Sequence, residues 1–152
     1  MEKSHFDSLI IGFGKGGKTL AQDLAAKGEK VVVIEKSDQM YGGTCINVGC
    51  IPTKSLVQNS KFSSRHTDWD FAAKSEFYKK SIEEKRELTA FLRQKNYAML
   101  ADNPSITVVN GFASFIDKNN VKVTNASGCD VVFSADKIFI NTGAKEIVPS
   151  IS

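Results

Sequence analysis

A β-α-β unit at the start of the chain constrains the fold more strongly than any other feature of the sequence. Residues 6–11 are a short apolar run, residues 18–27 have the spacing of an amphipathic helix, and residues 31–34 are four consecutive β-branched side chains. A continuous β-branched run is typical of a strand that is buried on both faces. The two strands are therefore expected to lie parallel, joined by a right-handed crossover through the helix.

Glycines fill the turn between the first strand and the helix, in the pattern Gly12-x-Gly14-x-x-Gly17. The first glycine permits a tight turn, the second lets a pyrophosphate approach the backbone, and the third lets helix and strand pack closely. Glu35 ends the second strand, eighteen residues after Gly17, where a carboxylate can accept hydrogen bonds from a ribose diol. Three glycines alone would also suit a flexible turn, but this combination indicates a site for the ADP moiety of NAD or FAD.

After the second strand the sequence predicts a polar loop and two helices. The loop covers residues 37–49, one helix begins near Ile51, and a longer helix covers residues 73–100. Residues 59–70 are polar and are expected to interrupt the helical pattern. The apolar positions of the longer helix lie at helical spacing: Leu88, Phe91, Leu92 and Met99.

Short strands are expected in the last third of the chain. Four alternating stretches cover residues 106–109, 113–115, 121–124 and 131–133. Turn-forming residues between them indicate an antiparallel meander. A second buried strand is expected over residues 137–140. With 152 residues, 41% of them hydrophobic, the chain can form one globular α/β domain.

Two cysteines follow the ribose-binding acid, in the pattern Cys45-x-x-x-x-Cys50. They could form a disulfide, supply half of a zinc site, or lie there by coincidence. A turn at Gly49 and a helix start near Ile51 can bring their Cα atoms within the ~5.5 Å that a disulfide prefers. A cysteine at a helix N-terminus also has a stabilised thiolate, which is the condition for reactivity.

The zinc interpretation needs further ligands, for which the candidates are Cys129, His5 and His66. None of them stands in a paired spacing, so no metal site is expected. A dinucleotide site followed directly by a reactive dithiol favours FAD over NAD, because a flavin is needed to convert hydride chemistry into thiol chemistry.

The composition argues against two classes of partner. The formal charge of +3 comes from 20 basic and 17 acidic residues spread along the chain, which is too weak and scattered for a nucleic-acid surface. No segment approaches the ~18 apolar residues of a membrane span. Residues 1–5 are polar and no targeting signal is visible, so a cytoplasmic location is expected.

Residues 41–54, with the sequence YGGTCINVGCIPTK, resemble the redox signature of the class I pyridine nucleotide-disulfide oxidoreductases. The resemblance covers the whole chain and includes the glycine motif, Glu35, residues 111–113 and residues 137–144. Within the family, the sequence is most similar to the bacterial branch that responds to reactive chlorine species and reduces hypothiocyanous acid. The segments that carry this narrower resemblance are residues 12–15, Met40-Tyr41, Thr53 and residues 91–96.

The resemblance implies a Rossmann-like FAD/NAD(P)-binding fold, with a parallel sheet, flanking helices and an antiparallel β-meander. It also implies a set of FAD contacts: the pyrophosphate at Gly12, Gly14 and Gly17, the adenosine ribose at Glu35, further contacts at Gly43 and Thr44, the adenine at the backbone of Ala113, and the flank of the cofactor at Thr142, Gly143 and Ala144.

The resemblance assigns the chemistry to three more residues. Cys50 would face the flavin as the charge-transfer thiol, and Cys45 would be the interchange thiol that attacks the substrate. Lys54 would lie near flavin N5, where a cation stabilises the reduced flavin. Without the cysteines beside it, Lys54 would be interpreted as a solvated helix lysine.

Members of this family continue with an NAD(P)H domain and an interface domain that completes a homodimer. Residues 1–152 are therefore expected to be the N-terminal part of the FAD-binding domain, an incomplete domain that is inactive alone and binds FAD weakly or not at all. The parent would pass electrons from NAD(P)H through FAD and the Cys45–Cys50 disulfide to an oxidised, thiol-reactive small molecule. The alternatives are a free-standing flavin or nucleotide-binding redox module and a zinc-stabilised nucleotide-binding domain.

Overall fold

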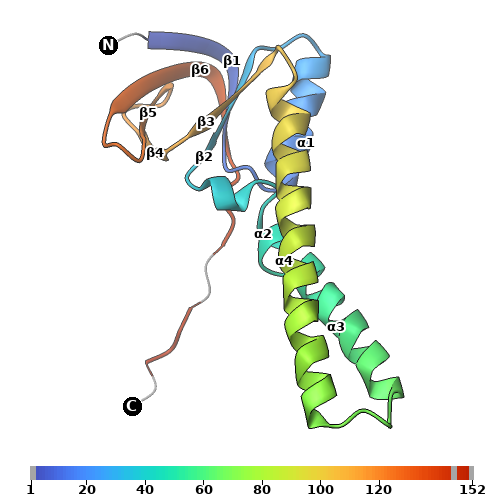
Figure 1. Cartoon of the computed structure of the whole chain (residues 1–152). Coiled ribbons are helices and arrows are strands. Elements are labelled where there is room, and N and C mark those ends of the chain that lie inside the picture. The colour runs from blue at the N-terminus through green and yellow to red at the C-terminus, as the bar shows by residue number, and fades with distance from the viewer. Residues whose placement is uncertain (1–2, 145–146, 151–152) are drawn as a thin grey trace.

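A mixed sheet of six strands lies at one end of the molecule, in the order β3-β2-β1-β6-β5-β4 (Figure 1). The computed structural model describes residues 3–144 and 147–150, so both ends of the expected 1–152 domain lie outside the described residues. The strands are β1 (Lys3–Ile11), β2 (Val31–Glu35), β3 (Ile106–Asn110), β4 (Phe112–Phe115), β5 (Asn120–Thr124) and β6 (Asp130–Ile140). The helices are α1 (Lys15–Ala26), α2 (Thr44–Asn47), α3 (Cys50–Arg65) and α4 (Phe71–Ala101), with a short 3-10 helix η1 (Asp38–Met40).

The strands β3, β2, β1 and β6 run parallel, which confirms the expected β-α-β unit. Leu9 of β1 lies opposite Val32 of β2 on one side and opposite Ile138 of β6 on the other, and α1 connects β1 to β2. β2 is buried along its whole length, as its β-branched run predicts. α1 begins at Lys15, three residues earlier than the apolar spacing indicates, because glycines occupy its first turn.

Each face of the parallel strands has its own apolar core. Successive side chains of β2 point to opposite faces, so Val31 and Val33 pack against α1 and α4, whereas Val32 and Ile34 pack against β5 and β6. Burial stabilises by roughly 1.5–3 kcal/mol for each large apolar side chain removed from water. The two cores hold the carboxyl ends of the parallel strands at one edge, where the glycine turn lies.

The antiparallel meander is confirmed, but its last strand corrects the sequence prediction. β4 pairs with β5 and β5 pairs with β6, both antiparallel. The sequence predicts separate strands over residues 131–133 and 137–140, whereas β6 is one strand of 11 residues. Its polar middle looks like an interruption, yet Ser134 and Ala135 are buried because β6 pairs with β1 on one side and with β5 on the other.

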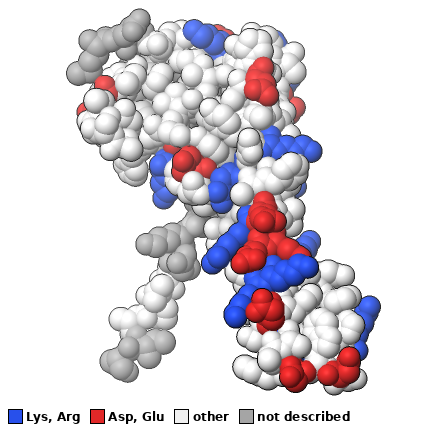
Figure 2. All heavy atoms as spheres, viewed as in Figure 1, with Lys and Arg blue, Asp and Glu red and all other residues white. Residues whose placement is uncertain are grey.

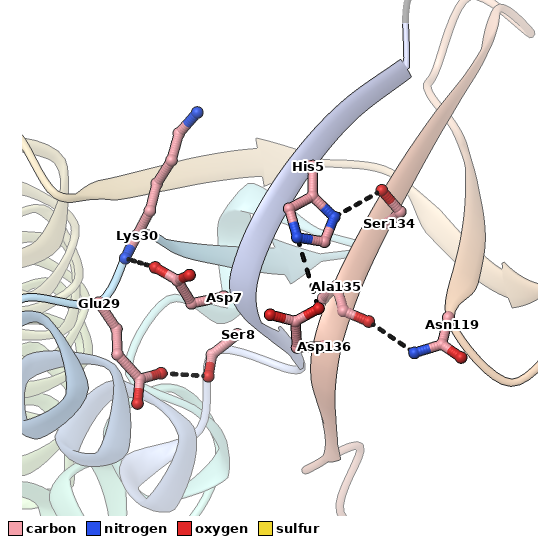
Figure 3. A network of polar contacts seen from close by, with 9 residues as sticks. All are labelled: His5, Asp7, Ser8, Glu29, Lys30, Asn119, Ser134, Ala135 and Asp136. Atoms are coloured by element: carbon pink, nitrogen blue, oxygen red, sulfur yellow. Dashed lines mark hydrogen bonds and ion pairs between the residues drawn. The ribbon is translucent and has the colours of Figure 1, made fainter.

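Polar side chains tie β1 to its neighbours at the end of the sheet away from the glycine turn (Figure 3). The His5 ring contacts the Ser134 hydroxyl at 3.1 Å and the Asp136 carboxylate at 3.5 Å, both on β6. The Ser8 hydroxyl donates to the Glu29 carboxylate at 2.6 Å, next to the start of β2. His5, one of the candidate zinc ligands, therefore joins two strands.

The helices α3 and α4 form a hairpin that projects from the sheet (Figure 1). The sequence predicts an interruption over residues 59–70, but α3 continues through most of that segment. The stabilising contacts are tertiary, and the local sequence does not show them. The rings of Phe62 on α3 and Phe77 on α4 lie 5.5 Å apart, and His66 stacks on Trp69 at 4.3 Å where the two helices connect.

α4 buries a different face from the one that its apolar spacing predicts. Leu88, Phe91 and Met99 are exposed and Leu92 is half-buried. The buried positions are Ser81, Thr89, Asn96 and Leu100. The two hydroxyl groups among them donate to carbonyls one turn earlier in the helix, so they can be buried without a loss of hydrogen bonds. Figure 2 shows acidic and basic side chains interspersed along the hairpin.

Candidate functional site

The glycine turn between β1 and α1 has no room for a side chain at two of its three predicted glycines. Gly12 has a φ of +108°, and a Cβ there would lie 2.3 Å from the carbonyl oxygen of Asn141. A Cβ on Gly17 would lie 2.4 Å from the carbonyl oxygen of Gly12. The first glycine therefore makes the turn and the third lets α1 close against it, which is the packing that the glycine pattern predicts.

The second glycine of the turn lies against the segment that carries both cysteines, residues 41–50, called the cysteine loop below. A Cβ on Gly43 would lie 2.7 Å from the Cα of Gly14, and Gly43 has a φ of +76°. The backbone N–H of Gly42 also donates to the carbonyl of Phe13 at 3.0 Å. The glycine turn and the cysteine loop are thus packed backbone against backbone.

Asn141, the residue after β6, holds the glycine turn in place through hydrogen bonds. Its backbone N–H donates to the carbonyl of Ile11 at 2.8 Å, and its side-chain amide donates to the carbonyl of Gly12 at 3.2 Å. A Cβ on Gly14 would come within 3.2 Å of the same amide nitrogen. Asn141 was not predicted as a site residue because it precedes Thr142 to Ala144 without a motif of its own.

The Glu35 carboxylate, at the end of β2, is held in place by hydrogen bonds from the chain itself. It is buried, with one oxygen accepting from the backbone N–H of Phe13 at 2.8 Å and the other from the backbone N–H of Ser37 at 3.2 Å. Each carboxylate oxygen has two lone pairs, so acceptor capacity remains for a ribose diol. Glu35 therefore holds Phe13, the middle residue of the glycine turn, whether or not it also binds a ribose.

A cavity of about 510 Å³ lies at the carboxyl edge of the parallel strands, where ligands bind in open α/β sheets. All the predicted cofactor residues except Gly17 line it: Gly12, Gly14, Glu35, Gly43, Thr44, Ala113, Thr142, Gly143 and Ala144. Gly17 packs inside the turn instead. The lining residues for which no cofactor contact was predicted are Ile11, Ile34, Lys36, Met40, Gly111, Phe112 and Asn141.

The cysteine loop is more ordered than the polar loop that the sequence predicts. It contains the one-turn helix α2, which is too short to show a helical period in sequence. Cys45 lies in α2, and Cys50 is the first residue of α3, within one residue of the predicted start. Backbone N–H groups of Val48 and Gly49 both donate to the carbonyl of Thr44, at 2.9 and 2.8 Å, and fold the chain back on itself.

The turn brings the two thiols together. Both cysteines are free, Cys45 half-buried and Cys50 exposed. The pKa of Cys45 is raised, first because its thiol shares a hydrogen bond with Cys50 and then because it is partly desolvated. The positive charges of Lys15 and Lys54 act in the opposite direction on the same pKa. The two thiols are therefore near enough to affect each other's ionisation, which is the arrangement that a thiol–disulfide exchange pair needs.

Lys54 stands one turn after Cys50 on α3, which places the two on the same side of the helix. Its side chain is exposed and does not line the cavity. It lies near enough to Cys45 to lower that thiol's pKa. The structure thus groups Lys54 with the cysteines, and its predicted role toward a flavin stays a prediction.

Asn47, between the two cysteines, ties the cysteine loop to α4. Its side-chain amide donates to the carbonyls of Tyr41 and Gly43, both at 3.0 Å. Its side-chain oxygen accepts from Nε of Arg93 at 2.9 Å, and Arg93 donates a second bond to Gln39 at 2.5 Å. The sequence analysis placed Arg93 in a branch-specific segment but gave it no role, because its partner is 46 residues away.

The described residues, 3–144 and 147–150, contain no group of three or more His, Cys, Asp and Glu side chains that could hold a metal ion. Cys129 is exposed in the turn before β6, and its N–H donates to the Asn125 side chain at 2.9 Å. The zinc alternative therefore lacks a ligand set within this part of the chain. None of the helices described combines the length and the hydropathy that a membrane span requires.

Comparison with known proteins agrees with this geometry. A family model described as pyridine nucleotide-disulphide oxidoreductase matches residues 6–152. The chain belongs to this family. Its match begins with β1 and includes the glycine turn, the cysteine loop and the segment after β6, which are the parts of the chain that form the site.

Two relatives show how far the similarity extends. The probable pyridine nucleotide-disulfide oxidoreductase RclA of Escherichia coli is 47% identical over 146 residues, which is 96% of this chain and 30% of that protein. Human mitochondrial dihydrolipoyl dehydrogenase is 35% identical over 152 residues, which is 94% of this chain and 29% of that enzyme. The chain therefore spans about 30% of the length of such relatives.

Solved structures give the same result. The HOCl-induced flavoprotein disulfide reductase RclA from Escherichia coli, solved as a Cu(II) complex, superposes with a TM-score of 0.83 at 47% identity. The superposition covers 99% of this chain and 31% of that one. The expected α/β fold is therefore that of a flavoprotein disulfide reductase. The similarity to an HOCl-induced enzyme supports the narrower resemblance to the chlorine-responsive branch.

Proposed function

We propose that the cavity at the carboxyl edge of the sheet binds the ADP moiety of FAD, beside a redox-active Cys45–Cys50 pair. The whole protein is, on this proposal, an NAD(P)H-dependent flavin disulfide oxidoreductase that acts on an oxidised small molecule. One observation carries it. The cavity is lined by predicted cofactor residues from distant segments, among them Gly43 and Thr44, which immediately precede the first thiol in the chain.

The residues that line the cavity suit this cofactor. Backbone N–H groups of the turn from Gly12 to Gly14 would receive the pyrophosphate. Glu35 would accept from the ribose, and the backbone of Ala113 would meet the adenine. Thr142 to Ala144 would pass along the cofactor, while Gly17 keeps α1 close to the turn. When bound, the flavin would supply the chemistry that links a nicotinamide hydride to a disulfide.

The thiols would perform the exchange with substrate. Cys45 would attack the oxidised substrate, and Cys50 would then attack Cys45 to close the disulfide. Cys50 would stand nearer the flavin, and Lys54 would supply positive charge near flavin N5. We further propose that the whole protein is a homodimer, as its family resemblance implies.

FAD should bind this chain weakly. The glycine turn and Glu35 offer a few net hydrogen bonds of about 1 kcal/mol each, against an immobilisation cost of at least several kcal/mol for a large flexible ligand. Because the gain comes from the ADP half, ADP should bind within about tenfold of FAD. NMR titration of the chain with FAD, ADP and FMN at millimolar concentration tests this. FAD and ADP should shift the amides of Gly12, Gly14 and Gly43, and FMN should not.

A pair of variants separates the site from the general surface. Glu35→Gln keeps an acceptor for Phe13 but removes the charge and one ribose acceptor, so ADP affinity should fall by about tenfold, or about 1.4 kcal/mol. Glu87→Gln, an exposed acid on α4, is the matched control and should change nothing. If FMN shifted the same amides as strongly as ADP, or if ADP shifted none of them, the proposed cofactor site would be wrong.

A further inference from the structure

We propose that Lys15 and Lys18, together with Lys54, make the thiol of Cys45 selective for negatively charged oxidised substrates. This inference rests on the proposed function, in which Cys45 attacks the substrate. It adds a substrate class, anionic disulfides and similar anionic oxidants of thiols. It also assigns a specificity-determining role to two lysines of the glycine turn.

Lys18 is held in place next to the cysteine loop. Its ammonium group donates a hydrogen bond to the side-chain oxygen of Asn96, a buried residue of α4. The amide of Asn96 in turn donates to the carbonyl of Leu92 at 2.6 Å, which fixes its orientation. A Cβ on Gly42 would lie 3.2 Å from Cγ of Asn96, so this pair lies directly beside the start of the cysteine loop.

Lys15 lies on the same side of α1, one turn earlier. A Cβ on Gly43 would lie 3.5 Å from the backbone nitrogen of Lys15, so the first residue of α1 adjoins the loop. Partial burial and the charge of Lys15 both lower the pKa of Lys18, which shows that the two cations repel each other. Two lysines three residues apart destabilise a helix slightly. Such an arrangement needs a compensating role.

The charges around Cys45 come from every element that packs near it. α1 provides Lys15 and Lys18, and α3 provides Cys50 and Lys54, each of which interacts electrostatically with Cys45. α4 adds the Arg93 guanidinium, one hydrogen bond away through the loop. The charged groups with the largest effects on the Cys45 thiol are Cys50, Lys15 and Lys54. An anion that approaches the thiol therefore meets the positive charges of lysines from α1 and α3.

Counter-charge for a cofactor pyrophosphate is the competing explanation for these lysines. The cavity argues against it, because Lys36 lines the cavity and neither Lys15 nor Lys18 does. Lys18 instead donates its hydrogen bond to Asn96 of α4. The two lysines thus serve the thiol side of the glycine turn.

The exchange balances without any further reagent. The Cys45 thiolate attacks one sulfur of a substrate disulfide, so a mixed disulfide forms and the first substrate thiolate leaves. The Cys50 thiolate then attacks the sulfur of Cys45, closes the internal disulfide and releases the second substrate thiolate. The two electrons that reduce the substrate come from the two cysteines, and their two protons pass to the two leaving thiolates. Nearby cations stabilise both the attacking thiolate and an anionic substrate.

The test uses the reduced chain with Cys129→Ser in every variant, so that two thiols remain. Stopped-flow rates are compared for three disulfides: dithionitrobenzoate, a dianion; hydroxyethyl disulfide, which is neutral; and cystamine, a dication. Internal disulfide formation is confirmed by mass spectrometry. Each rate is divided by the rate of the same probe with a small free thiol at the same pH, which removes intrinsic reactivity.

The normalised rate should be highest for the dianion and lowest for the dication. Lys15→Gln and Lys18→Gln should each lower the dianion-to-dication ratio by roughly fivefold, since removing one nearby charge acts in opposite directions on the two probes. Lys15→Arg and Lys18→Arg keep the positive charge and should leave the dianion-to-dication ratio close to that of the unsubstituted chain. Lys27→Gln, at the far end of the same helix, carries the same change in net charge and should leave the ratio unchanged.

A second measurement needs no variant. Raising the ionic strength from about 0.01 M to about 1 M shortens the screening length from about 30 Å to about 3 Å, and the preference for the dianion should largely disappear. Disulfide formation with no charge preference, or a Lys27→Gln effect equal to that of Lys18→Gln, overturns this inference alone. Failure to form the internal disulfide with any probe overturns the proposed function as well.

Discussion

Replacing Gly12 with alanine should destabilise the chain far more than replacing Gly28, although both glycines flank α1 and both have positive φ. The backbone angle φ is +108° at Gly12 and +89° at Gly28, and residues other than glycine rarely adopt such values. The difference lies in the surroundings. A Cβ on Gly12 would lie 2.3 Å from the carbonyl oxygen of Asn141, whereas a Cβ on Gly28 has nothing within 4 Å.

The magnitudes follow from this comparison. Gly28→Ala should cost about 1 kcal/mol of unfolding free energy, which is the strain of a positive φ in a residue with a Cβ. Gly12→Ala adds a contact that forces β6 and the turn apart, so the loss should be about 3 kcal/mol or more. The difference in unfolding free energy between the two variants measures how tightly the residue after β6 packs against the glycine turn.

Urea unfolding followed by circular dichroism measures both free energies in one type of experiment. The same variants titrated with ADP connect packing to function, because Gly12→Ala displaces the turn that faces the cavity and Gly28→Ala does not. Equal losses of stability in the two variants would falsify the claim that the Asn141 carbonyl closes on Gly12. Unchanged ADP binding by Gly12→Ala would separate the turn from the cofactor site.

Three further variants test the site. In Cys50→Ala, the main cause of the raised pKa of Cys45 is removed, so the pH profile of Cys45 alkylation by iodoacetamide should shift to lower pH; a shift to higher pH would contradict the hydrogen bond between the thiols. Arg93→Met should slow closure of the internal disulfide about tenfold, with Arg86→Met as control, and equal rates would mean that the cysteine loop needs no anchor on α4. The raised pKa of Tyr41 means that the folded state holds the phenol proton to higher pH than the unfolded state does, so the unfolding free energy should decrease as pH rises above about 10. Tyr41→Phe should lower the unfolding free energy by about 1 kcal/mol at pH 7 and should show a smaller decrease at alkaline pH. An identical alkaline decrease in the variant would contradict the assignment to Tyr41.

Sequence reasoning succeeded where the signal is local. The β-branched run of β2 and the glycine spacing each impose a strong local requirement on the backbone, so the β-α-β unit and the cavity-lining glycines of the turn, Gly12 and Gly14, could be predicted. The cysteine turn was predictable for a similar reason, because Gly49 and Pro52 mark a turn and a helix start. Every one of these features depends on residues close together in the chain.

Sequence reasoning failed where a distant partner decides. β6 continues through its polar middle because Ser134 lies between two neighbouring strands, and α3 continues because Phe62 meets Phe77 on α4. On α4, Asn96 is buried and Phe91 is exposed. Asn96 can be buried because Lys18 of α1 donates a hydrogen bond to its side-chain oxygen. In the sequence such positions look exposed, because the partner that buries them is distant in the chain. The periodicity of apolar residues could therefore not have identified them.

Phe13, the unspecified residue of the Gly-x-Gly pattern, connects the proposed cofactor site to the cysteine loop. Its N–H donates to Glu35 at 2.8 Å, and its carbonyl accepts from Gly42 of the cysteine loop at 3.0 Å. Its side chain is fully buried, with its ring 5.0 Å from that of Tyr41. One buried residue therefore positions Glu35 on one side and the start of the cysteine loop on the other. Because exchange chemistry depends on placement to within about 1 Å, a buried aromatic residue at this position keeps the thiols in register with the cavity.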